Sequence, residues 1–75
     1  MTSKHRFRGK YRLELRERDH APAHVHLVGG SVDVIIDLAT LDSDGVWPRG
    51  LQADVLAWVT AHRDELMEEW HRWHS

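Results

Sequence analysis

The sequence predicts one small α+β domain, in which a three-stranded antiparallel meander packs one face against a single long C-terminal helix. Three observations predict this fold. Apolar and charged residues alternate over 11–16, which is strand periodicity. Two β-rich runs flank Gly29-Gly30, a strong hairpin signal. Apolar side chains over residues 50–73 recur at helical spacing.

The first predicted strand has one apolar and one charged face. Residues 1–8 are polar and are expected to be frayed at their start. Tyr11, Leu13 and Leu15 then alternate with charged residues, so the even-numbered positions share the charged face. These positions are Arg8, Lys10, Arg12, Glu14, Arg16 and Arg18.

The hairpin has a register that follows from its turn. A two-residue Gly29-Gly30 loop pairs Val28 with Ser31 and places Asp33 opposite His26. This register gathers an apolar face that the helix covers, namely Val25, Leu27, Val32, Val34, Ile36 and Leu38. The other face is predicted to be open, and it carries His24, His26, Asp33, Ile35 and Asp37.

Residues 42–45 have turn composition and separate the hairpin from the helix. Val46 and Trp47 form either a fourth, short strand or an extended lead-in. Pro48 precedes the helix, which is predicted to run from about residue 50 to residue 73. Its apolar face consists of Leu51, Val55, Trp58, Val59, His62, Leu66, Trp70 and Trp73.

The 75 residues form one domain, 1–75, with an ordered core expected over roughly 7–73. The sequence has no cysteine, which excludes disulfides and cysteine-based zinc sites. The most apolar run, residues 32–38, is interrupted by two aspartates and is too short to span a membrane. No apolar signal segment is present at the N-terminus, so the cytoplasm is the expected location.

Charge is distributed unevenly along the chain. Residues 1–18 contain seven Lys or Arg and two Glu, whereas residues 19–75 contain three Arg and ten Asp or Glu. Such a chain can meet an anion with one end and a basic protein with the other. Alternatively, the two ends neutralise each other within the fold.

His24-Val25-His26 is the sharpest local signal for a site. Residues i and i+2 of a strand point the same way, so both imidazoles are expected on one face. They would supply half of a zinc or other transition-metal site, with His20 as a third ligand. Asp33 would be a fourth ligand or would orient the His26 ring. The alternative is that these histidines only form hydrogen bonds or lie on the surface.

Other residues suggest binding rather than catalysis. Asp19 and His20 can cap the turn that contains Pro22, and no serine lies in a nucleophile motif. The cations of the charged face, with Asp19 beside them, are candidates for contact with nucleic acid or a protein. Trp47 and Trp73 are candidates for a protein interface, since tryptophan is enriched at binding hot spots.

The segment Arg18-Asp19-His20-Ala21-Pro22-Ala23-His24-Val25-His26 resembles the R-D-H-x-P-P-H-x-H signature of the bacterial domain of unknown function (DUF) 4160 family. Residues 34–38 resemble its central strand. Pro48, Trp58, Glu65-Leu66 and Trp70 resemble its helix pattern. Ala23 stands where the signature has its second proline, and the segment 40–47 is shorter than the corresponding segment of the family pattern.

The resemblance implies no established activity. It implies a small bacterial protein often encoded beside a second small domain, as in toxin–antitoxin pairs. The leading hypothesis is therefore a protein-binding module, either one member of such a pair or a small phage or mobile-element inhibitor, whose partner is an adjacent gene product or a second copy of the chain. The alternative is a metal-dependent hydrolase or nuclease that uses His20, His24 and His26.

Overall fold

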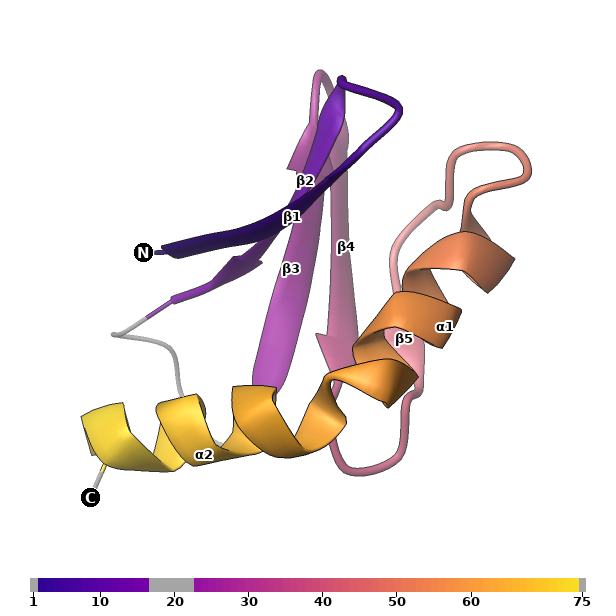
Figure 1. The fold of residues 1–75 in the computed structure, drawn as a ribbon. Coiled ribbons are helices and arrows are strands. Elements are labelled where there is room, and N and C mark those ends of the chain that lie inside the picture. The colour runs from indigo at the N-terminus through magenta and orange to yellow at the C-terminus, as the bar shows by residue number, and fades with distance from the viewer. Residues whose placement is uncertain (1, 17–22, 75) are drawn as a thin grey trace.

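The fold is α+β, with one five-stranded antiparallel sheet and two helices (Figure 1). The computed structural model of the chain describes residues 2–16 and 23–74. The strands are β1 (Thr2–Phe7), β2 (Tyr11–Leu15), β3 (His24–Gly29), β4 (Val32–Asp37) and β5 (Ser43–Asp44). Their order in the sheet is the order in the chain, so the sheet is a meander as predicted.

Two strands were not predicted. Residues 2–7 form β1 instead of a frayed start, because a turn at Arg8, Gly9 and Lys10 folds them back onto β2. Arg8 and Gly9 both take positive φ, and the Lys10 N–H donates to the Phe7 carbonyl at 3.2 Å. The last strand is Ser43–Asp44, so Val46 and Trp47 are the extended lead-in rather than a strand.

The predicted register of the β3–β4 hairpin is wrong by two residues. Gly29 pairs with Val32, and the turn is Gly30-Ser31. Gly30 has a φ of 55°, and a type II′ turn needs positive φ only at its first central residue. Gly29 instead lies in β3, where a Cβ would stand 2.6 Å from the Lys10 carbonyl oxygen. A shift of two residues leaves every side chain on its predicted face.

The core lies between one face of the sheet and the two helices. Its sheet residues are those of the predicted apolar face, together with β2. The fully buried members are Leu13, Leu15, Val25, Leu27, Val34, Ile36 and Leu38, and Leu51, Val55, Val59, Leu66 and Trp70 cover them. In Figure 1, α2 crosses below the N-terminal end of β3, where the ring centroid of Trp70 lies 5.1 Å from that of His24. No helix among the described residues is long and apolar enough to cross a membrane.

The predicted single helix is two helices, α1 (Gln52–Ala61) and α2 (Arg63–His74), which meet at His62. His62 leaves helical geometry, with φ −113° and ψ 13°, and its ring Nδ1 lies 2.8 Å from the Trp58 carbonyl oxygen. Arg63 then donates to the Leu38 carbonyl at 2.6 Å and to the Ala39 carbonyl at 2.7 Å. These contacts fix the bend that Figure 1 shows between α1 and α2.

Candidate functional site

The second face of the sheet contains a buried carboxylate held by two arginines. Glu14 of β2 is only 1% exposed. Its Oε2 lies 2.5 Å from Arg12 Nε and its Oε1 lies 3.4 Å from Arg16 Nη2. The three side chains project from one side of a strand, because they are two residues apart. Arg12 and Arg16 therefore neutralise Glu14 and do not form a purely cationic surface.

The two histidines of β3 lie together on the same face. Their ring centroids are 5.0 Å apart. His26 is 5% exposed, and its Nδ1 lies 3.2 Å from Asp33 Oδ1. The register places Ile35 opposite His26, so Asp33 reaches the ring from the diagonal position rather than from directly opposite. With a proton on Nδ1, His26 donates a hydrogen bond to Asp33. This bond fixes the orientation of the imidazole ring and therefore the direction of its Nε2 atom.

The prediction of an open second face is wrong at its centre, because Glu14 and His26 are buried there. The ring centroid of His24 lies 5.1 Å from that of Trp70 in α2. The side chains of His24 and His26 therefore pack within the fold rather than standing on an exposed surface.

The four predicted metal ligands are only partly brought together. His24, His26 and Asp33 are neighbours, and Asp33 contacts His26 as an orienting carboxylate would. Within residues 2–16 and 23–74, no three His, Asp or Glu side chains are arranged to hold a metal ion. His20 lies outside the described residues, as do Arg18 and Asp19.

The predicted row of cations is divided between two places. Arg8 and Lys10 lie in the β1–β2 turn rather than in a strand, and Arg12 and Arg16 are the partners of Glu14. The Arg8 Nη1 donates to the Arg49 carbonyl at 3.0 Å. Lys10 Nζ lies 5.5 Å from the Tyr11 ring centroid. Arg8 therefore lies against residues 49–50, whereas Lys10 lies beside Tyr11 and Gly30.

Val46 and Trp47 form an apolar ridge between α1 and the β3–β4 turn. Val46 is 87% exposed, the most exposed large hydrophobic residue among those described. Trp47 is half-buried, packs against the core and donates from Nε1 to Ser43 Oγ at 2.9 Å. Trp73, the other predicted interface tryptophan, is half-buried on α2 and also packs against the core.

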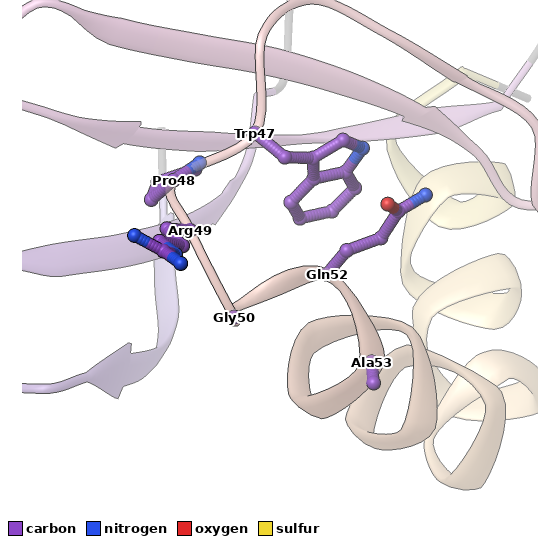
Figure 2. A pocket seen from close by; sticks show the side chains of 6 residues that line it. All are labelled: Trp47, Pro48, Arg49, Gly50, Gln52 and Ala53. Carbon is purple, nitrogen blue, oxygen red and sulfur yellow. The ribbon is translucent and has the colours of Figure 1, made fainter.

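Two grooves include Trp47 in their lining. The larger one, which we call the Trp47 groove, has a volume of about 590 Å³ and runs between the 47–50 loop and the start of α1 (Figure 2). It is lined by Trp47, Pro48, Arg49, Gly50, Gln52 and Ala53. Figure 2 shows the Trp47 indole and the Gln52 side chain on one side of the loop and Arg49 on the other. The second groove is lined by Tyr11, Ser31, Val32, Asp33, Val46, Trp47 and Pro48.

Sequence reasoning missed two parts of these sites. Glu14 was assigned to an exposed face, although flanking arginines two residues away on each side indicate a shielded carboxylate. Arg49 was not singled out, although Trp47-Pro48-Arg49-Gly50 combines an aromatic side chain, two turn residues and a cation. The proximity of Arg8 to Arg49 could not be inferred, because it depends on the unpredicted turn at 8–10.

A family model described as a domain of unknown function (DUF4160) matches residues 11–71. The match includes β2 to β5, α1 and most of α2, and so covers well over half of the chain. No curated protein matches the chain. No solved structure matches it either.

Proposed function

The chain belongs to the DUF4160 family, and from this premise we propose that it is a protein-binding module that acts through contact with a partner protein. The single observation that supports this most strongly is the Val46–Trp47 ridge. Tryptophan is enriched at binding hot spots, and Val46 beside it adds exposed apolar surface that a partner would bury.

The proposed partner is the product of the adjacent gene in a toxin–antitoxin-like pair, or the target of a small phage or mobile-element inhibitor. The ridge supports contact with a folded surface or a peptide, because the two grooves that include Trp47 in their lining can receive side chains. This class of partner follows from the gene arrangement that the family resemblance implies.

Val46→Ser tests this proposal. It removes the exposed apolar surface without adding charge, and we expect roughly tenfold weaker binding to the purified adjacent gene product, since a buried valine contributes about 1.5 kcal/mol or more. Native mass spectrometry and calorimetric titration measure complex formation. Thermal unfolding should be nearly unchanged, because Val46 is 87% exposed. Trp47 is a poorer choice, since it also packs against the core.

Ile35→Ser is the matched control. Ile35 is also an exposed large hydrophobic residue, at 38%, but it lies on the second face of the sheet. Its substitution should leave the affinity unchanged. If wild-type protein stays monomeric and binds neither the adjacent product nor itself, the protein-binding proposal is rejected.

A second candidate function is a metal-dependent hydrolase or nuclease. The observation that favours it is the pairing of His24 and His26 together with the His26–Asp33 contact. Asp33 on Nδ1 would leave Nε2 of His26 as the ligand atom, and His20 would be the third ligand. A bound zinc ion would polarise a substrate or activate water.

Zinc titration of the wild-type protein and of His24→Ala/His26→Ala tests this second candidate. The expected result is one ion per chain, seen by native mass spectrometry, with loss of that ion in the double variant because two imidazole ligands are removed. Asp33→Asn should weaken zinc binding by about tenfold or more, as substitutions of orienting partners do. Absence of a stoichiometric ion at micromolar zinc would exclude the metal-dependent reading.

A further inference from the structure

The lining of the Trp47 groove combines apolar residues with one cation. Trp47, Pro48 and Ala53 supply apolar surface, and Arg49 is the one charged residue among the six that line it. No carboxylate is part of the lining. Asp54, the next residue along α1, is exposed. This composition differs from the second groove, whose lining includes Asp33.

Arg8 adds a second guanidinium beside the loop that lines this groove. Its Nη1 donates to the Arg49 carbonyl oxygen at 3.0 Å, and its Nη2 lies 3.3 Å from the point where a Cβ on Gly50 would stand. The side chain is thus held against the loop that lines the groove. Arg8 and Arg49 make no ion pair with a carboxylate among the described residues. Each guanidinium has five donors.

These contacts give the groove a preferred ligand chemistry. A carboxylate can accept two parallel hydrogen bonds from one guanidinium, and charge-assisted bonds of this kind are stronger than neutral ones. An apolar side chain next to that carboxylate would meet Trp47 and Pro48. Arginine and tryptophan are also both enriched at binding hot spots.

We propose that the Trp47 groove binds an acidic segment of the partner protein, in which an apolar residue packs on Trp47 and Pro48 while neighbouring carboxylates contact Arg8 and Arg49. This inference rests on the proposed protein-binding function and specifies its partner chemistry. It also assigns a use to Arg8, a cation of the basic segment 1–18 that does not contact Glu14.

The arrangement favours an acidic polypeptide over a nucleic acid. Phosphate backbones are bound by extended rows of cations, and here two members of the predicted row, Arg12 and Arg16, contact Glu14 instead. The bases of a single-stranded nucleic acid stack on exposed aromatic faces, whereas Trp47 is half-buried and packs against the core. Binding of an oligonucleotide at this groove is therefore an outcome that would overturn the proposal.

Three short peptides test the inference. The first is acetyl-Glu-Glu-Leu-Phe-Glu-Glu-amide, the second replaces each Glu with Lys, and the third replaces Leu and Phe with Ala. Binding to ¹⁵N-labelled protein is followed at the Trp47 indole N–H, assigned with Trp47→Phe, and at the Gln52 side-chain amide. We expect the first peptide alone to shift these signals strongly, and added salt to weaken its binding, because exposed charges are screened.

Arg49→Glu is the diagnostic variant. Its carbonyl remains available to Arg8, but its side chain now repels carboxylates, so the affinity for the first peptide should fall by about tenfold or more. Arg72→Glu is the control, because it changes net charge equally at an exposed position near the C-terminal end of α2, whereas the groove is lined by residues 47–53. It should change the affinity less than about twofold.

The results separate this inference from the protein-binding proposal. No shift at about 1 mM of the first peptide, equal shifts by the lysine peptide, or binding of a single-stranded DNA 12-mer in its place would overturn the inference. In that case the adjacent gene product could still bind to the protein. Its affinity would then fall in Val46→Ser and stay unchanged in Arg49→Glu. That pattern would support protein binding and reject the acidic segment.

Discussion

Trp70→Ala is expected to lower the free energy of unfolding by about 4 kcal/mol, since large-to-small changes at buried tryptophan cost about 3–5 kcal/mol. Trp70 is 3% exposed and joins α2 to the core and to the ring of His24. A domain of this length has a total stability of roughly 4–11 kcal/mol. The variant should therefore retain a stability of only roughly 0–7 kcal/mol.

The loss should begin with α2. A helix of twelve residues is marginal without tertiary contacts, and His62 separates it from α1. We expect far-ultraviolet circular dichroism to lose about half of the helical signal before the sheet melts, because α1 and α2 contain ten and twelve residues. Amide exchange of α2 should accelerate while that of β3 and β4 remains slow.

Trp73→Ala is the matched control on the same helix. Trp73 is half-buried, so its removal should cost about 1–2 kcal/mol. Equal destabilisation by the two substitutions would contradict the assignment of Trp70 as the main contact of α2. A cooperative loss of helix and sheet in Trp70→Ala would show that α2 does not unfold separately.

The double substitution Arg12→Gln/Arg16→Gln should destabilise the protein by about 3 kcal/mol. It leaves the Glu14 carboxylate, 1% exposed, without cations, and an uncompensated buried charge costs about 3–5 kcal/mol. We expect the lower end of this range of destabilisation, because the side chains of Arg12 and Arg16 are 45% and 33% exposed. Water therefore screens their ion pairs with Glu14. Urea unfolding with an unchanged m-value would measure the loss.

Adding Glu14→Gln to the double variant should restore most of the stability, because the buried charge is removed together with its partners. Arg72→Gln provides the comparison with an exposed pair. Arg72 and Glu68 are 65% and 76% exposed and 3.5 Å apart, so this change should cost only a few tenths of a kcal/mol. If the triple variant is no more stable than the double one, the arginines stabilise β2 through packing rather than through charge.

The sequence predicted the core better than it predicted the register. Burial depends on which face a side chain occupies, and that face follows from alternation, so Val25, Leu27, Val34 and Ile36 were assigned correctly. The turn was misplaced because Gly29 and Gly30 look equivalent in sequence. Their roles differ through a tertiary contact: Gly29 admits the backbone of Lys10 and the ring of Tyr11.

The second face was harder to predict. The pairing of His24 with His26 follows from strand periodicity, but burial of His26 and Glu14 depends on packing around them. The break at His62 depends on its side chain reaching the Trp58 carbonyl and on Arg63 reaching the 38–39 carbonyls. None of these contacts has a local sequence signal. The position of Arg8 beside the Trp47 groove likewise depends on its contact with Arg49, 41 residues away in the sequence.

The agreement between strand order and chain order has a kinetic consequence. Every strand pairs with its neighbour in sequence, so each ladder closes a short loop at small entropic cost. Domains dominated by such local contacts fold quickly. The helices dock over a longer separation, as the Lys4–Glu69 pair illustrates across 65 residues. Hairpins are therefore expected to form the folding nucleus, and substitutions in α2 should mainly accelerate unfolding rather than slow folding.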